Sequence, residues 1–303
     1  MEAFPWNEIK NTEGKGVMKK ILFIMYLFVF ILCFPPITSA FEGEMTVHFI
    51  NVGQGDAILM ETPLDKTILI DGGPPKAGEK VVSYLQEQGV ETIDLIIATH
   101  PDKDHIGGLP QVMKRFNVKE ILDTGKVHIT KTYYQYTQEI RKQGIPVRLA
   151  EVNQEVPVDS SVQIEILNAN KKVQSNNQSS IALHVNYGKV DFLLLSDIEK
   201  RQEKKMIEQK EIEAEILKIA HHGSKTSTSQ RLLEAVNPQA AILTYSKNNK
   251  FGHPVPQVID RLNETNALIY STAAFGDIVI ETNGEHYFIT PSETPVESML
   301  HHT

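Results

Sequence analysis

Cysteine and long apolar runs are scarce in this sequence of 303 residues, and basic residues are fewer than acidic ones. The single cysteine is Cys33, so the chain can form no internal disulfide. Acidic residues outnumber lysine and arginine by 38 to 30, and the net charge of −8 argues against broad electrostatic attraction to nucleic acid. A polyanionic partner would therefore have to be held by a local group of basic residues.

The main apolar run, residues 21–34, is shorter than the about 18–20 residues that a membrane-spanning helix needs. It follows a basic pair and precedes small residues that end at Ala40, which is the layout of a secretory signal peptide. We therefore predict a signal peptide over residues 18–40 and a secreted protein; a retained membrane anchor is the alternative. Cys33 would leave with this segment, and the exported chain would then have no thiolate nucleophile or cysteine metal ligand.

Residues 1–17 are polar and precede a second methionine, and we interpret them as a disordered extension from an upstream start codon. At the other end, residues 291–303 are polar and lack periodicity, so we expect a flexible tail.

Residues 198–215 are dense in charge of both signs, which indicates a solvated helix face rather than a nucleic-acid patch.

Between these ends, short β-branched runs alternate with amphipathic stretches of helical period. The predicted strands cover residues 46–52, 57–61, 67–70, 93–98, 162–167, 181–186, 190–196, 216–220, 240–244, 267–271, 277–281 and 287–290. The predicted helices cover residues 77–88, 109–116, 133–142, 198–208, 227–236 and 256–262. Strand pairs come first in each half and strand–helix units follow. We therefore expect one α/β domain over residues 41–290, with two sheets packed together and helices outside.

Side chains that can bind metal recur where four predicted strands end. Asp71 ends one strand, His100 a second and Asp197 a third, and His221 with His222 follow a fourth. Strand ends that share a sheet edge converge in space, so we expect these positions to meet at one site. Taken alone, Asp71 could form a turn before two glycines and Asp197 could cap a helix.

The stretch THPDKDHIGG, residues 99–108, places four candidate ligands in one turn: His100, Asp102, Asp104 and His105. Imidazole and carboxylate groups are ligands of divalent cations. Without a cation, two carboxylates at this spacing would repel and raise each other's pKa. A polar surface loop is the alternative, although the paired glycines indicate a tight entry to a helix.

The order of these ligands, completed by HHGS at residues 221–224, resembles the metallo-β-lactamase superfamily. NVGQGDA at residues 51–57 and FGHP at residues 251–254 narrow the resemblance. Together with the THPDKDHIGG turn, they look like the metallo-β-lactamase-like domain at the C-terminal end of ComEC competence proteins. The resemblance covers about residues 45–290.

This resemblance implies an αββα sandwich of two mixed β-sheets, with one or two divalent metal ions at one edge. The ions would be manganese or zinc, with magnesium as a further candidate. His100 and Asp102 would face the first metal, Asp104 and His105 the second, and Asp197 would bridge them. One of His221 and His222 would complete the second site, and we expect His221 because it directly ends the strand. Residues 175–180 contain no histidine where the superfamily usually has one, so occupancy by a single metal is an alternative.

The resemblance also suggests roles for residues around the metals. Asp104 would orient the attacking water as well as bind metal, and Asp71 would hold a ligand imidazole or the turn in place. Asp56 would either be structural or line the site. His253 would donate to a substrate phosphate or leaving oxygen, or else only shape its loop. Ser224, Lys225 and Thr226 would bind a substrate phosphate where a helix begins.

Together with the predicted signal peptide, the resemblance implies a secreted, monomeric, metal-dependent hydrolase, most simply a phosphodiesterase or nuclease that acts on DNA through a metal-activated water. The alternatives are a small-molecule hydrolase of the β-lactamase or lactonase type and a binding protein with a decayed site. Asp102 in place of histidine, together with the missing middle histidine, argues against a β-lactamase. An oxygen donor at this position favours manganese or magnesium over zinc.

Overall fold

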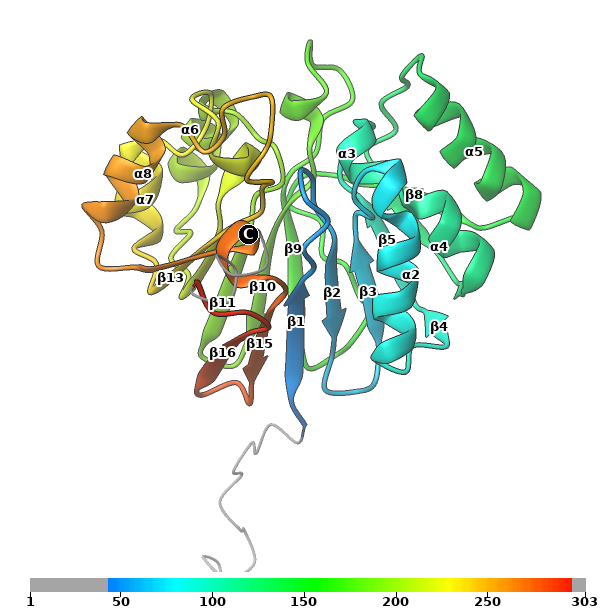
Figure 1. Cartoon of the computed structure of the whole chain (residues 1–303), viewed down its shortest axis with the longest axis horizontal. Coiled ribbons are helices and arrows are strands. Elements are labelled where there is room, and N and C mark those ends of the chain that lie inside the picture. The colour runs from blue at the N-terminus through cyan, green and yellow to red at the C-terminus, as the bar shows by residue number, and fades with distance from the viewer. Residues whose placement is uncertain (1–42, 296–303) are drawn as a thin grey trace, which may run out of the picture. The chain divides into compact units, whose positions relative to one another are not determined.

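The structure is a computed structural model that describes residues 43–295 (Figure 1). The predicted start extension, the predicted signal peptide with Cys33 and the end of the predicted tail lie outside these residues. Within the described part, no helix combines the length and the apolar character needed to cross a membrane.

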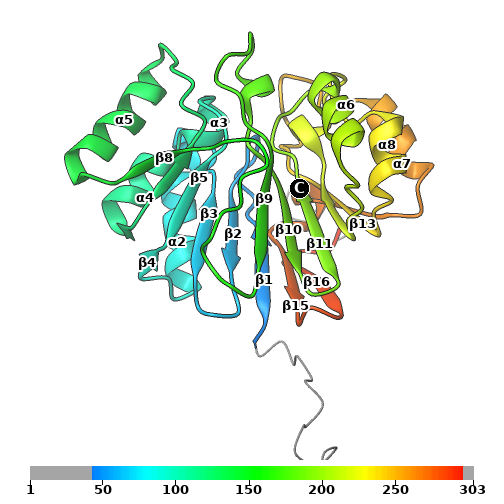
Figure 2. The ribbon, with the colours of Figure 1, turned by 180° about the vertical axis from the view of Figure 1, so that it is seen from behind.

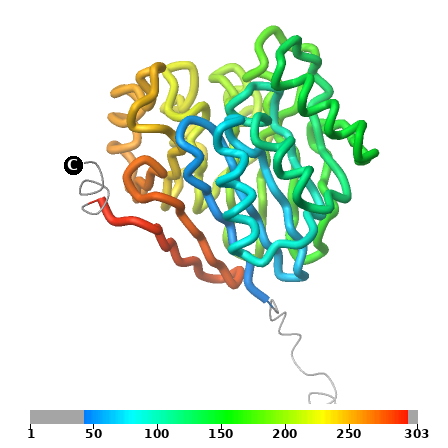
Figure 3. The backbone as a smooth tube through the Cα atoms, turned by 45° about the vertical axis from the view of Figure 1, so that its right-hand side comes forward, coloured from blue at the N-terminus to red at the C-terminus, as the bar shows by residue number. Residues whose placement is uncertain are grey.

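Eight strands form the larger of two main sheets, in the order β16-β15-β1-β2-β3-β5-β7-β8. In that order they are Tyr287–Pro291, Ile278–Thr282, Met45–Phe49, Ile58–Glu61, Thr67–Ile70, Leu95–Ala98, Ile121–Asp123 and Val147–Leu149. β1, β2 and β3 are antiparallel neighbours, whereas β3, β5, β7 and β8 run parallel. The C-terminal hairpin of β15 and β16 returns to pair with β1, as the red and blue ends of the tube show (Figure 3).

The second sheet has six strands in the order β14-β13-β12-β11-β10-β9. They are Leu268–Ser271, Ala240–Leu243, Ile216–Lys218, Val190–Leu194, Ala182–Tyr187 and Gln163–Asn168. Strands β11 to β14 run parallel. A separate pair joins β4 (Thr92–Ile93) to β6 (Asn117–Val118). The helices are α2 (Gly78–Glu87), α3 (Lys103–Ile106), α4 (Leu109–Arg115), α5 (Lys131–Gln143), α6 (Lys200–Gln209), α7 (Gln230–Val236), α8 (Pro256–Asn263) and α9 (Thr272–Phe275).

Alternation along the strands creates three buried layers. Phe49 and Ile97 of one sheet and Phe192 of the other belong to a single core between the sheets. On the outer face of the larger sheet, residues such as Ile96 pack against α2, α4 and α5. On the outer face of the second sheet, residues such as Leu193 pack against α6, α7 and α8 (Figures 1 and 2). The predicted αββα architecture is confirmed.

Each predicted strand and helix has a counterpart, with ends that shift by a few residues. The predicted strand over residues 93–98 is two strands, β4 and β5, which are separated by Asp94; the Asp94 carboxylate accepts a hydrogen bond from the Thr67 N–H (3.0 Å). Strands β6, β7 and β8 and helices α3 and α9 were not predicted. They are two to four residues long, which is too short to show a period.

Candidate metal centre

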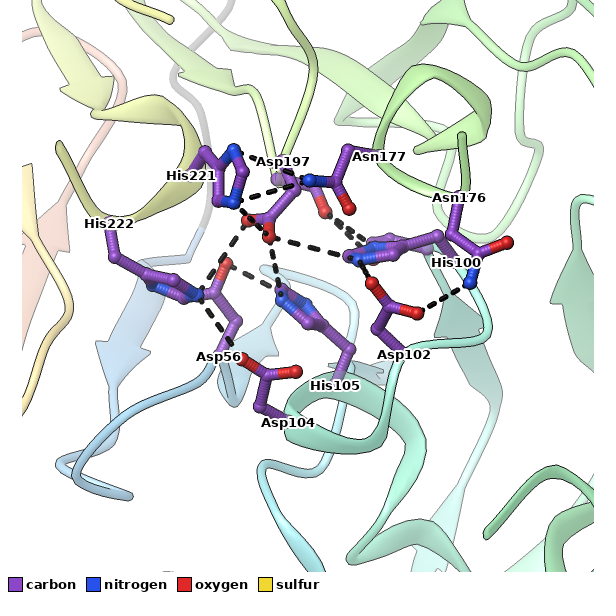
Figure 4. A network of polar contacts seen from close by, with 12 residues as sticks. Asp56, His100, Asp102, Asp104, His105, Asn176, Asn177, Asp197, His221 and His222 are labelled. Atoms are coloured by element: carbon purple, nitrogen blue, oxygen red, sulfur yellow. Dashed lines mark hydrogen bonds and ion pairs between the residues drawn. The ribbon is translucent and has the colours of Figure 1, made fainter. Parts of the chain in front are cut away.

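The carboxyl ends of four strands meet at one edge of the sandwich. Asp71 directly follows β3 and His100 follows β5 by two residues, and these strands are parallel neighbours. Asp197 follows β11, and the two histidines of HHGS follow β12, its parallel neighbour in the other sheet. The predicted convergence of strand ends is therefore present, and Figure 4 shows it for His100, Asp197, His221 and His222.

Glycine-bearing turns interlock beneath these side chains. A Cβ on Gly55 (φ +136°) would lie 2.1 Å from the carbonyl oxygen of Asp104, and a Cβ on Gly108 would lie 2.0 Å from that of Gly72. The Asp56 N–H donates to the Asp104 carbonyl (3.2 Å), and the Gly72 N–H donates to the His105 carbonyl (2.7 Å). The NVGQGDA motif thus supports the ligand-bearing turn through its backbone.

Three imidazoles present an unpaired nitrogen to one carboxylate. The Nε2 atoms of His100, His105 and His222 lie 3.8, 3.4 and 3.7 Å from Asp197 carboxylate oxygens. All three rings are buried, and each Nε2 lacks a hydrogen-bond partner among the described residues, as does Asp197 Oδ1. Buried polar atoms without partners are costly, and one or two divalent cations would satisfy them. These residues therefore fit a metal ion.

The opposite nitrogen of His105 is held by Asp71. His105 Nδ1 lies 2.7 Å from Asp71 Oδ2, and the Thr99 N–H and hydroxyl donate to the same carboxylate at 2.9 and 2.6 Å. Burial alone would lower the pKa of His105, but the carboxylates of Asp197 and Asp71 raise it well above its usual value. Asp71 therefore fixes the orientation of this imidazole and leaves its Nε2 facing Asp197.

His222 and His100 are oriented in the same way. The Nδ1–H of His222 donates to the backbone carbonyl of Thr244 (2.7 Å), which fixes the tautomer with a free Nε2. His100 Nδ1 lies 3.1 Å from the Thr99 hydroxyl. Burial lowers the pKa of His222, so this imidazole is neutral and ready to bind a cation.

His222, and not the expected His221, joins the groups of ligand atoms. β12 ends at Lys218, and both histidines have left-handed backbone angles (φ 51° and 54°) in the turn η3 (Ala220–Gly223). This turn directs His222 inward beside Asp104 and His105. His221 lies 3.7 Å from Asp197, but it is partly exposed and its Nδ1 contacts the Thr226 hydroxyl (3.1 Å).

The Asp197 carboxylate lies within 3.8 Å of ring nitrogens of four histidines, namely His100, His105, His221 and His222. Burial alone would raise the pKa of its carboxyl, but the surrounding imidazoles, His105 first, hold the pKa well below the usual range. An ionised carboxylate that faces imidazoles on both sides has the placement of a bridging ligand (Figure 4). Asp104 approaches from the open side, with its Oδ2 3.9 Å from His222 Nε2 and its side chain 24% exposed.

Asp102 lies on the His100 side. Its Oδ2 is 3.6 Å from His100 Nε2, and its Oδ1 accepts a hydrogen bond from the Asn176 amide (2.6 Å). Burial alone would raise the pKa of Asp102, but His100 and Asn176 lower it to about 2. Residues 175–180, the segment that lacks a histidine, therefore contact the site through side-chain amides: Asn176 contacts Asp102, and Asn177 contacts His221. These two asparagines were not predicted as site residues.

A buried ion pair behind the imidazoles was also not predicted. Lys218 is fully buried, and its Nζ lies 3.0 Å from Asp56 Oδ2. Asp56 also accepts a hydrogen bond from the Thr244 hydroxyl (2.5 Å) and lies 3.6 Å from the ring of His222. Asp56 therefore supports the site from behind. A lysine inside the apolar run EILKIAHH was the available signal.

The expected phosphate site at Ser224, Lys225 and Thr226 is not at the start of a helix. α7 begins at Gln230, and the Ser229 hydroxyl caps it by accepting from the Leu232 N–H. The three expected residues lie in the turn before it. Ser224 is buried and Lys225 is exposed. The helix-start prediction is wrong because the chain after HHGS first forms a turn.

His253 lies beside His221, with ring centroids 5.5 Å apart. Burial, with the neighbouring His221, lowers the pKa of His253 to about 4. The ring is therefore neutral at pH 7, so it can donate one N–H but is not an imidazolium acid.

The family model for the metallo-beta-lactamase superfamily matches residues 50–246. ComE operon protein 3 of Bacillus subtilis is 28% identical over 87% of this chain and 35% of its own length. Recombination protein 2 of Haemophilus influenzae is 27% identical over 82% of this chain and 31% of its own length. The chain thus spans about a third of these relatives. The crystal structure of CmlA, a diiron beta-hydroxylase from Streptomyces venezuelae, has the same fold, with a TM-score of 0.50 and 12% identity over 75% of this chain and 52% of that one.

Proposed function

Because the chain belongs to the metallo-β-lactamase superfamily, we propose that its metallo-hydrolase site cleaves phosphodiester bonds of nucleic acid. The observation that carries this proposal is the oxygen-rich ligand set. Asp102, held by Asn176, stands beside His100, and Asp104 stands beside His222. Carboxylate ligands suit the hard cations that serve phosphoryl chemistry.

Two groups of residues would hold the cations. His100, Asp102 and Asp197 would hold one, and Asp104, His105 and His222 would share Asp197 with a second. A divalent cation bound there lowers the pKa of a water ligand and polarises the oxygen that gains charge. The partly exposed Asp104 carboxylate would orient the attacking water through Oδ2, and a neutral His253 would donate one N–H to a phosphate oxygen.

The relatives support a role on nucleic acid. The name of Recombination protein 2 refers to recombination, which is a process on DNA, and that protein matches most of this chain. The match covers under a third of the relative's own length. The activity and the DNA substrate are therefore proposed for this chain on the strength of its site.

We propose manganese or magnesium as the working metal, since Asp102 replaces a softer imidazole donor. Asp102→His should shift the metal content of purified protein toward zinc. Metal analysis of wild type and variant, each loaded from an equimolar mixture of manganese and zinc, measures this. The same manganese-to-zinc ratio in both proteins would contradict the role of Asp102.

The test of function is a panel of substrates with one protein. The full chain, loaded in turn with manganese, magnesium or zinc, is assayed on single- and double-stranded DNA, bis-p-nitrophenyl phosphate and a chromogenic cephalosporin. We expect the phosphodiesters to be cut with manganese or magnesium and the cephalosporin to remain intact. Asp104→Asn should lower kcat by about a hundredfold or more. Asp260→Asn, on the exposed face of α8, is the matched control.

Two results would overturn the nuclease proposal. One is that no phosphodiester is cut with any of the three metals. The other is that Asp104→Asn, with unchanged metal content, cuts as fast as wild type. Cleavage of the cephalosporin alone would instead identify a small-molecule hydrolase.

We also propose that the protein is exported, on the basis of the basic pair and apolar run within residues 18–40. Mass spectrometry of culture supernatant should find a chain that begins near Phe41. Detection of the full-length chain in the membrane fraction alone would contradict export.

A further inference from the structure

A cavity of about 550 Å³ opens beside the candidate metal centre. Asp104 lines it, so the cavity adjoins the open side of the site. Its volume lies within the range of roughly 300–1,000 Å³ that is typical of ligand pockets. The opposite wall comes from residues 246–251, between β13 and α8.

The charge of this cavity is opposite to that of the whole chain. Lys76, Lys103 and Lys250 line it, and Asp104 is the one acidic residue among the described residues of its wall. The complete chain carries a net charge of −8. Three exposed ammonium groups around one cavity therefore form a local site for an anion with several charges.

An exposed aromatic ring lies in the same wall. Phe251 is 53% exposed, so much of its ring is open to contact with a ligand. The Lys250 ammonium lies 5.4 Å from the centre of this ring, and His253 stacks on the ring at 5.7 Å with an angle of 24°. An exposed aromatic ring of this kind offers a surface on which a nucleobase can stack.

Asn249 holds this wall in place. Its amide donates to the carbonyls of Ser246 (2.8 Å) and His253 (2.6 Å). Its side-chain oxygen accepts from the N–H groups of Phe251 (3.1 Å) and His253 (3.0 Å). Phe251 is therefore presented by a hydrogen-bonded turn, and a ligand would meet it without having to order the loop first.

We propose that this cavity binds an unpaired segment of a nucleic-acid strand next to the scissile phosphodiester, with a base on Phe251 and flanking phosphates on Lys76, Lys103 and Lys250. The substrate class rests on the proposed function. A base that stacks on Phe251 has left its own duplex stack, so the structure assigns single-stranded substrate or a frayed end. The lysines contact the backbone, so the site accepts DNA and RNA.

Binding can be measured apart from cleavage. The metal-free full chain is titrated with fluorescein-labelled dT and rU oligonucleotides of twelve residues and with a duplex of the same length, by fluorescence anisotropy. Phe251→Ala should weaken binding of the single strands about tenfold. Phe251→Trp should restore it, because the indole also stacks. Phe288→Ala, an exposed ring on β16 that does not line the cavity, is the matched control.

The contribution of Lys76, Lys103 and Lys250 should be visible in how oligonucleotide affinity depends on salt concentration. Replacing all three by glutamine should reduce the slope of log K against log salt by about 2, since each phosphate contact on a single strand contributes about 0.7. Lys204→Gln, on α6 outside the cavity, should leave the slope unchanged. The proposal is overturned if Phe251→Ala binds both single strands as tightly as wild type, if duplex binds more tightly, or if the slope does not fall.

Kinetics separate this proposal from the proposed function. With metal bound, Phe251→Ala should raise KM for a single-stranded oligonucleotide about tenfold, whereas Phe288→Ala should leave both this KM and bis-p-nitrophenyl phosphate hydrolysis unchanged. If wild type cuts neither substrate, the nuclease proposal fails while the binding result still decides the role of the cavity. If Phe251→Ala leaves KM for the oligonucleotide unchanged, the role of Phe251 in strand binding is wrong.

Discussion

Lys218 shows how a single buried charge can support a site that it does not enter. Lys218 is the last residue of β12, and its ammonium contacts Asp56 and donates to the Ile219 carbonyl (2.9 Å). Burial alone would raise the pKa of Asp56, but Lys218 lowers it most and keeps the carboxylate ionised behind His222. The ion pair thus keeps a negatively charged carboxylate, that of Asp56, next to the His222 ring.

Lys218→Met should destabilise the protein by about 3–5 kcal/mol, because it leaves the Asp56 carboxylate buried without its cation. Urea unfolding of the metal-free protein measures this. The double variant Asp56→Asn with Lys218→Met should recover part of the loss. Lys204→Met, at an exposed position, is the control. A loss below about 1 kcal/mol, the value of a surface pair, would show that the buried pair has no such role.

Asp159, which lies away from the candidate metal centre, should make the folding stability depend on pH. It is buried and accepts from the Ser161 N–H (2.7 Å), the Ser161 hydroxyl (2.6 Å) and the Leu64 N–H (3.0 Å). Burial alone would raise its pKa, but these hydrogen bonds lower it below the usual value. Because the pKa of Asp159 is lower in the folded state, its ionised carboxylate stabilises the fold at pH values above the unfolded-state pKa of about 3.9. This stabilisation is lost as the pH falls through the folded-state pKa.

Asp159→Asn should therefore cost about 1–3 kcal/mol at pH 7, and the difference from wild type should shrink below about pH 4. Unfolding by urea at pH 7, 5, 4 and 3 measures the trend. Asp260→Asn, on the exposed side of α8, should change little at any pH. A difference that stays constant down to pH 3 would mean that the charge of Asp159 is not involved.

At the scale of elements, the turns around the site depend on close backbone contact. Gly108 precedes α4 and lies against the turn after β3, where a Cβ would meet the Gly72 carbonyl oxygen at 2.0 Å and its carbon at 3.0 Å. The Gly108 N–H donates to the Gly73 carbonyl (2.9 Å). The distance between the two turns sets where His105 lies.

Gly108→Ala should destabilise the protein by about 1–3 kcal/mol and also reduce bound metal, because the added methyl group pushes the ligand turn from β3. Thermal unfolding and metal analysis measure the two effects. Gly144→Ala is the control: it has a left-handed φ of +65° at the end of α5 and no atom within 4 Å of its Cβ position. It should lose some stability and keep its metal. Equal metal loss in both variants would refute the local role of Gly108.

Most of the elements and the position of the site could be predicted from the sequence. Apolar periods locate the strands, and chain order puts Asp71, His100 and Asp197 at strand ends that share an edge. The orientation of the side chains at these positions could not be predicted, because it depends on backbone angles that are set by tertiary contacts. The left-handed angles of His221 and His222 decide which ring points inward. Asn176 and Lys218 were missed for a related reason, since their partners are distant in sequence.

At the scale of the molecule, the metal-free protein concentrates negative charge at one edge of the sandwich. Five carboxylates gather there (Asp56, Asp71, Asp102, Asp104 and Asp197), within a chain that is already at −8. Lys218 offsets one of them. A divalent cation at this edge would add ligand bonds and relieve the repulsion, so metal binding should stabilise the whole fold.

Removal of metal with EDTA should therefore lower Tm, and addition of manganese at about a hundredfold over Kd should raise it by about 5–10 °C, which corresponds to about 2.7 kcal/mol. Differential scanning calorimetry measures the shift. His222→Ala should abolish most of it, because the ring supplies a buried Nε2 to the cluster. His221→Ala, at the neighbouring residue, should retain most of it. If His221→Ala loses the shift and His222→Ala keeps it, the turn after β12 presents its histidines in the opposite sense, and His221 is the ligand.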